Sequence, residues 1–407
     1  MYIRMGKMKK GLVLPSVEKL DKWGFYLLCG FALFSNLTIA GGNIFLVPLV
    51  LVFFLRLISK RDDWCVALPD GTLTVSLLLL VCATALSALC SVDPLKVSKV
   101  VDYYGYHMLP LYAVLLLVRE KERLLTIALC VAGSFAINGV AILYEGIVQQ
   151  NYRADGFAEP MTAAGFLSMI VPALALLCVA GKVTRKYRLP LGILTVLGIV
   201  SLLLNGTRGA WIAVAVSCTV VGFMAVQRKK RFLLGMLVAA LVFGGIFSFS
   251  PILSGRLATI GDMQFQSNSE RLLLWKSAFH MFEDHPIVGV GLSRFREEYQ
   301  GGYILPEAKE PYLDHAHNNI MHMLAECGII GVLALLFFWG TWFSYGVASW
   351  RKVRSAAALV FLAVLLGSFL QGLTEYNLGR SFVMKVYWLL LALCLQWLRL
   401  EKASSYQ

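Results

Sequence analysis

Residues 314–340 read DHAHNNIMHMLAECGIIGVLALLFFWG, a group of polar side chains that passes directly into a long apolar segment. Stretches of about 20 mainly apolar residues recur along the chain, and each is long enough to cross a hydrocarbon core of about 30 Å. Of the 407 residues, 58% are hydrophobic and 15% are charged, whereas about a quarter of the residues are charged in soluble domains. The composition therefore predicts an all-α, polytopic membrane protein.

The hydropathy pattern predicts about twelve transmembrane helices. They centre on residues 24–40, 43–58, 72–90, 104–118, 124–144, 161–181, 189–205, 209–226, 232–250, 320–345, 356–373 and 381–398. We expect one integrated membrane domain, with nine helices in residues 1–250, a large outside loop in 251–319 and three helices in 320–407.

The basic residues predict the orientation. If the N-terminus lies inside, every inside loop carries at least three Lys or Arg residues, such as RKKR at 228–231, and the short outside loops carry at most two. This positive-inside pattern places both termini in the cytoplasm. The basic stretch before the first span lacks the apolar region of a cleavable signal. The net charge of +13 is thus explained by topology, and we expect no nucleic-acid partner.

The outside loop between the ninth and tenth spans has the pattern of a folded segment. Ser267 and Glu270 have the spacing of a capping box, apolar residues then recur at helical spacing, and Pro286 ends the segment. We expect an amphipathic helix on the outer membrane surface. GVGLSRF at 289–295 contains glycines typical of a phosphate loop, but it follows no predicted strand, so that assignment is rejected.

Three arginines stand out on the outside face: Arg153, Arg208 and Arg271. Arg208 occupies a tight turn between two spans, where a charge is costly unless it is paired or hydrated. Its side chain either extends to the headgroup region or pairs with an acid such as Glu375, or it belongs to an anion site. Because guanidinium groups match phosphate geometry, arginines that converge from separate loops would suit a pyrophosphate.

The histidines of the opening stretch allow several interpretations. On a helix, His317 and His322 point about 140° apart, and His315 and His322 lie roughly 10 Å apart. An extended segment would let His315 and His317 share an ion, but no third ligand is evident and we expect no metal. The remaining alternatives are a hydrogen-bonded interfacial histidine and a general base, since imidazole accepts a proton near neutral pH. Asn318 would then orient the ring or hold a sugar hydroxyl.

Three segments together resemble a known family. They are TRGAW at 207–211, SERLLLWKSAFHMFEDHPIVGVGLSRF at 269–295 and HAHNNIMHMLAECGIIG at 315–331. In this order, and with a large loop after the ninth span, they resemble the bacterial O-antigen ligase and Wzy-type polymerase superfamily. The resemblance is strongest over about residues 150–340 and extends to the topology of the whole chain.

The resemblance implies a membrane glycosyltransferase of the GT-C type at the outer face of the bacterial inner membrane. Such an enzyme moves a glycan from undecaprenyl pyrophosphate to an acceptor sugar, on lipid A-core or another saccharide, with inversion and without a metal or other cofactor. The matching motifs imply that His317 is the catalytic base and that Arg208 and Arg271 hold the leaving pyrophosphate. The candidate substrate-binding residues are Arg153, His315, Asn318, Trp275 and Glu375.

Two other activities remain as alternatives. A single dominant outside loop favours a ligase, whereas polymerases of the superfamily often have two. A transporter or flippase for lipid-linked glycans is the alternative from another class, but such proteins tend to carry charged residues near the bilayer midplane. Here the conspicuous charged residues are expected at one face.

Overall fold

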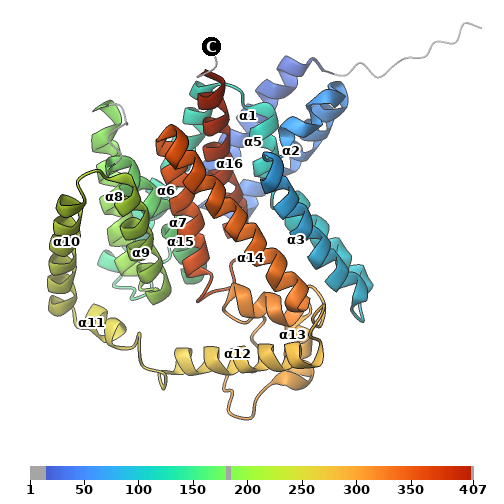
Figure 1. Cartoon of the computed structure of the whole chain (residues 1–407). Coiled ribbons are helices and arrows are strands. Elements are labelled where there is room, and N and C mark those ends of the chain that lie inside the picture. The colour runs from blue at the N-terminus through green and yellow to red at the C-terminus, as the bar shows by residue number, and fades with distance from the viewer. Residues whose placement is uncertain (1–14, 180–184, 405–407) are drawn as a thin grey trace, which may run out of the picture.

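The computed structural model describes residues 15–179 and 185–404. Every regular element in these ranges is a helix, and Figure 1 shows long helices side by side with shorter ones across one end of the bundle. Residues 1–14, where a basic cytoplasmic segment is expected, and Lys182 of an expected inside loop lie outside the described ranges.

The twelve predicted spans correspond in order to twelve helices. These are α1 (Val17–Phe34), α2 (Ile39–Ser59), α3 (Gly71–Cys90), α5 (Leu109–Leu117), α6 (Lys121–Leu143), α7 (Pro160–Val179), α8 (Arg185–Asn205), α9 (Arg208–Ala225), α10 (Lys229–Phe249), α14 (Asn319–Val353), α15 (Ala356–Gln371) and α16 (Ser381–Ser404). Within the described part of the chain, nine of them are long and apolar enough to cross a membrane, and α1, α5 and α15 are not among the nine. The predicted all-α polytopic fold is confirmed.

Two predicted spans differ from the structure at their ends. The span predicted over 104–118 is the nine-residue α5, preceded by a π-helical turn (Val101–Tyr106). Pro110 is in the first turn of α5, where its missing N–H costs no helical hydrogen bond. The first helix starts at Val17, where the Ser16 side chain accepts from the Lys19 N–H, and it ends at Phe34.

The spanning helices differ in how much of their surface the protein covers. Helices α7 and α16 are the most enclosed, and α15 packs against both. Helix α10 has no buried residue, and Figure 1 shows it standing at the edge of the bundle. The core therefore lies around α7, α15 and α16, with α10 left to the surrounding lipid.

The outside loop folds into short helices at one end of the bundle. They are α11 (Pro251–Ala258), α12 (Gln266–Asp284), α13 (Phe295–Glu298) and a π-helical turn (Tyr299–Tyr303). Figure 1 shows α12 lying crosswise under the ends of the spanning helices. Leu274, Ala278 and Met281 of α12 pack with residues such as Phe295 and Ala316 in a small separate core. The predicted helix in this loop is thus present, and it ends at Asp284, two residues before Pro286.

The predicted capping box is wrong. Helix α12 begins at Gln266, and its N-cap residue Phe265 makes no side-chain cap. Ser267 instead accepts a hydrogen bond from the Arg208 guanidinium, and the carboxylate of Glu270 accepts from the backbone N–H of Lys309. Ser267 and Glu270 therefore bond to residues distant in the sequence and do not cap the start of α12.

Helix α14 is broken near its start, and the segment after α12 crosses the break. Gly328 has φ 58° and ψ −158°, outside the helical region. The carbonyl of Pro286 accepts from the Ile329 N–H at 2.9 Å, and the Gly291 N–H donates to the carbonyl of Glu326 at 3.0 Å. The GVGLSRF segment therefore does not cradle a phosphate; it fastens the outside loop to α14.

The buried carboxylate of Glu326 completes this connection. It accepts from the backbone N–H of Ser293 at 2.8 Å and from that of Phe295 at 3.0 Å. These charge-assisted bonds at the first turn of α13 hold the loop against the part of α14 that follows the polar stretch.

We expect Gly328→Ala to destabilise the protein by about 1–3 kcal/mol, because a side chain at positive φ is strained. An added Cβ would also lie 2.5 Å from the Ile287 carbonyl oxygen. Gly340→Ala in the same helix is the matched control, since nothing lies within 4 Å of its added Cβ. The measurement is the thermal midpoint in detergent, and equal midpoints for the two variants would contradict this account of the break.

Candidate functional site

Two histidines and one glutamate meet where the polar stretch faces the last outside loop. The Nε2 atom of His315 lies 2.8 Å from Oε1 of Glu375, and Nδ1 of His317 lies 2.9 Å from Oε2. The Glu375 side chain is 1% exposed and that of His317 is 18% exposed. A buried carboxylate thus holds both rings, and the His317 ring remains open on its other side.

Asn318 builds this turn. Its Oδ1 accepts from the N–H groups of Ile320 and Met321 and so caps the start of α14. Its Nδ2 donates to the Leu373 carbonyl at 2.9 Å. Both polar groups of the side chain are therefore engaged with the backbone, which supports a positioning role; a sugar contact by Asn318 stays a prediction.

Asn319 fastens the opposite side of the same loop. Its Oδ1 accepts from the N–H of Asn377 at 2.9 Å, and its own N–H donates to the Gly372 carbonyl at 2.7 Å. The two asparagines together clamp residues 372–378 on both sides of Glu375. Just before them, His317 has φ 48°, a left-handed conformation that gathers at functional sites.

Hydrogen bonding fixes the charge states of the cluster. Burial raises the pKa of Glu375, but the hydrogen bonds from His315 and His317 and their charges lower it well below its ordinary range. Burial lowers the pKa of His315, but its bonds to Asp314 and Glu375 outweigh this and raise it. Ionised Glu375 can only accept, so Nδ1 of His317 is the donor in their hydrogen bond, and the neutral form of the ring carries its lone pair on Nε2, facing away from the carboxylate.

Arg380 is a further partner of the glutamate. Its Nη2 lies 3.3 Å from Oε1 of Glu375, and its Nη1 lies 3.2 Å from Oε2 of Glu159. The guanidinium thus connects the loop of Glu375 with the loop that precedes α7.

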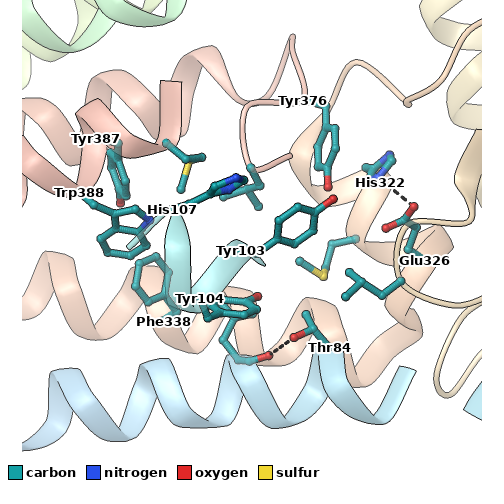
Figure 2. Close-up of a pocket in the computed structure, with 15 residues that line it drawn as sticks. Thr84, Tyr103, Tyr104, His107, His322, Glu326, Phe338, Tyr376, Tyr387 and Trp388 are labelled. Carbon is teal, nitrogen blue, oxygen red and sulfur yellow. Dashed lines mark hydrogen bonds and ion pairs between the residues drawn. The ribbon is translucent and has the colours of Figure 1, made fainter. Parts of the chain in front are cut away.

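His322 belongs to the wall of a pocket next to this cluster. Its ring stacks on Tyr376 with the centroids 3.6 Å apart, and its Nε2 lies 3.3 Å from Oε1 of Glu326. Figure 2 shows Tyr376 and Tyr103 with their hydroxyl groups turned toward each other beside His322. His322 thus supports the residue next to Glu375 from within the bundle.

The two histidines and Glu375 also have the composition of a metal site. Each offers one ligand atom, and the three atoms lie within 4.8 Å of one another. The third ligand could not be predicted from the local sequence, because Glu375 lies between α15 and α16, far along the chain from the histidines. However, Arg380 lies against the same carboxylate and Arg271 is within electrostatic range of it. These positive charges oppose a cation, so the arrangement fits a hydrogen-bonded base better than a metal.

A group of arginines lies beside the cluster of His315, His317 and Glu375, called the base cluster below. Arg208, Arg271 and Arg153, each predicted from the sequence, are within electrostatic range of one another, together with Arg256 of α11. Among the described residues, none of the four forms an ion pair with a carboxylate. Arg256 was not predicted, because its sequence signal is limited to its place in the loop shortly after the ninth predicted span.

Arg208 does not pair with Glu375, one of the alternatives left open by the sequence. Its Nη1 donates to the carbonyl and hydroxyl oxygens of Thr259, both at 2.7 Å. Its Nη2 donates to Ser267 at 2.7 Å and Asn268 at 3.0 Å. All four acceptors are neutral, so Arg208 orders the linker between α11 and α12 and keeps its charge uncompensated.

Helix α12 brings the arginine group to the base cluster. The half-buried Arg271 makes no hydrogen bond or ion pair with any residue that the structure describes. Burial lowers the pKa of Arg271, the charge of Glu375 raises it and that of Arg153 lowers it. One turn later, the Trp275 indole N–H donates to the Ala316 carbonyl at 3.0 Å. Residues four apart share a helix face, so this bond places Arg271 beside the segment that carries His315 and His317.

We expect the pH dependence of stability to report on His315. Its folded pKa is raised above the ordinary 6.5, so its charged form stabilises the protein fully below pH 6.5 and loses this contribution as the pH rises through the folded pKa. The thermal midpoint in detergent should fall over that window in the wild type and fall less in His315→Gln. The exposed His280 of α12 gives the control variant His280→Gln. Equal pH slopes in wild type and His315→Gln would contradict the assignment.

Part of the chain is similar to a known protein family. No curated protein matches the chain at a significant level. Residues 193–336 match the family model described as O-antigen ligase, and the matched range contains Arg208, Arg271 and His317 but ends before Glu375. Over residues 193–336 the chain is therefore similar to the O-antigen ligase family. The apolar helices are those of a multi-pass membrane protein.

Proposed function

We propose that the protein is a metal-independent, inverting glycosyltransferase that moves a glycan from undecaprenyl pyrophosphate to an acceptor sugar. One observation carries the proposal. A histidine held by a buried carboxylate lies next to arginines that have no ion-pair partner among the described residues. The first group suits a base for a hydroxyl proton, and the second suits an anionic leaving group.

The base step follows from the orientation of His317. An acceptor hydroxyl attacks C1 of the donor glycan, and Nε2 of His317 takes the hydroxyl proton as the new C–O bond forms. Glu375 accepts from Nδ1–H throughout and stabilises the imidazolium that develops. His315 and Arg380 hold the carboxylate in place.

The leaving step relies on the arginine group. As the bond from C1 to the pyrophosphate oxygen breaks, negative charge builds up on the diphosphate. Arg271, which has no hydrogen-bond or ion-pair partner in the described part of the chain, binds it, while Arg208 contributes charge from a fixed position. Preorganised positive groups of this kind stabilise developing charge without a metal ion.

The location of the site supports the membrane assignment. The base cluster and the arginines lie in loops that the positive-inside pattern predicts to be outside, at the end of the bundle where α12 crosses. We therefore place the site at the outer face of the bacterial inner membrane, with both termini in the cytoplasm. There the diphosphate of a lipid-linked glycan reaches the arginines while its polyprenyl chain stays in the bilayer.

The single folded outside loop favours a ligase, with lipid A-core or another saccharide as the acceptor. A polymerase, which would extend the donor glycan itself, is the alternative. The two differ only in the acceptor, so the same chemistry serves both.

The direct test is glycan transfer by the purified protein in detergent, with a chelator present. The donor is an undecaprenyl-pyrophosphate glycan, offered with and without an acceptor. We expect wild type and the exposed-residue control His280→Ala to transfer the glycan. His317→Ala should lose about 10²–10⁴-fold in rate, and Arg271→Ala about 10²–10³-fold.

Several outcomes would change the proposal. Undiminished transfer by His317→Ala removes the base assignment, and loss of wild-type activity with chelator indicates a metal at the histidines. Chain growth without acceptor indicates a polymerase. Movement of the lipid across liposomes without any transfer indicates a flippase.

Glu375→Gln provides a narrower test of the base. The amide keeps the size of the side chain but does not stabilise an imidazolium, so we expect kcat to fall about 10²-fold or more. The donor KM should change little, because the arginines are untouched. A change confined to KM would show that Glu375 acts in donor binding instead.

A further inference from the structure

Arg256 occupies a place that the proposed mechanism does not use. It lies on α11, and its half-buried guanidinium joins two other segments. Its Nη1 donates to the Gly206 carbonyl at 3.0 Å, and its Nη2 lies 3.4 Å from the Tyr152 carbonyl. Tyr152 immediately precedes Arg153, and Gly206 is two residues before Arg208. One guanidinium thus holds the two segments that carry these arginines.

The turn at Gly206 is shaped around this guanidinium. Gly206 has φ 67°, and a Cβ added there would lie 3.0 Å from Nε and 3.1 Å from Cζ of Arg256. Glycine adopts this conformation without strain and leaves room for the planar group. The glycine before Arg208 therefore serves Arg256 as well as the turn.

The bonds of Arg256 leave its charge uncompensated. Both acceptors are neutral carbonyls, and no described carboxylate forms an ion pair with it. Burial lowers the pKa of Arg256, and the charge of Arg153 lowers it further. Four guanidinium groups gathered without a counter-ion repel one another, and a bound anion relieves that repulsion.

Arg256 and Arg208 differ in the number of guanidinium N–H donors that remain available to a ligand. A guanidinium has five N–H donors. On Arg208, four bonds occupy the two terminal nitrogens, which leaves only Nε–H. On Arg256, two bonds leave three donors free, including Nε–H. Arg256 is therefore better equipped than Arg208 to bind phosphate oxygens directly.

We propose that Arg256 is a diphosphate-binding residue that lets the arginine group select a lipid diphosphate over a lipid monophosphate. The inference rests on the proposed function for the identity of the lipid. A diphosphate extends across more of the group and carries more charge than a monophosphate. The free donors of Arg256 would bind phosphate oxygens that a monophosphate does not supply.

Binding of two defined lipids tests this without any transfer reaction. Purified protein in detergent is titrated with undecaprenyl diphosphate and with undecaprenyl monophosphate. We expect wild type to prefer the diphosphate, and Arg256→Gln to lose about tenfold in diphosphate affinity with little change for the monophosphate. Arg256→Lys keeps the charge without the planar fork and should recover only part of the loss. The control is Arg296→Gln, at an exposed arginine of α13, which should bind both lipids as wild type does.

A second variant separates ligand binding from folding. Gly206→Ala keeps Arg256 in the chain but displaces its guanidinium, so it should show the same selective loss. Thermal midpoints of all variants are measured alongside. An equal loss for both lipids with a lowered midpoint would assign Arg256 a purely structural role, and wild-type preference in Arg256→Gln would also overturn the proposal.

The two proposals fail in different ways. If wild type transfers glycan but Arg256→Gln retains the diphosphate preference, the inference about Arg256 is wrong and the proposed function stands. If wild type transfers nothing but Arg256→Gln loses that preference, the diphosphate site stands and the proposed reaction is wrong.

Discussion

The buried carboxylate of Glu375 is the interaction on which the rest of the site depends. An ionised carboxylate is costly inside a protein unless each oxygen is hydrogen-bonded. Here His315 satisfies one oxygen and His317 the other, and Arg380 adds a positive charge. Asn318 and Asn319 hold these groups in place by bonding to the loop that carries Glu375. The capped start of α14 fixes the histidine segment. The loop attached across the break in that helix supports the same region.

The arginines of this site differ in the partners that surround their guanidinium groups. Arg380 is paired with carboxylates, and Arg208 is surrounded by neutral oxygens that fix its position. Arg271 has no partner among the described residues, and Arg256 has donors to spare. The arginine that pairs with Glu375 is thus compensated, whereas Arg208, Arg256 and Arg271 have no carboxylate partner among the described residues and can attract an anion.

Much of the fold could be predicted from the sequence, because each span carries its own apolar signal. A helix lies at each of the twelve predicted spans, in the predicted order, and nine of these described helices are long and apolar enough to cross a membrane. The helix expected in the loop before α14 is also present. The pairing of His317 with Glu375 was beyond reach, since periodicity within a helix does not report which loops meet 58 residues apart. The same limit explains the capping box, where Ser267 has a distant arginine as partner. Arg256 could not be predicted as a site residue, because the sequence does not show that its guanidinium contacts Gly206 and Tyr152.

The bond from Trp275 to the Ala316 carbonyl has a consequence for how the chain can vary in length. Arg271 and Trp275 share one face of α12, so inserting a single residue between them would turn one about 100° from the other. The stretch from 304 to 313 has no regular structure, and its backbone is hydrogen-bonded to Glu270 of α12 at Lys309 and Glu310. Residues inserted on either side of that contact would leave the face of α12 unchanged. Insertions during evolution should therefore accumulate between the π-helical turn and the polar stretch, while the spacing within α12 and from His315 to Asn319 stays constant.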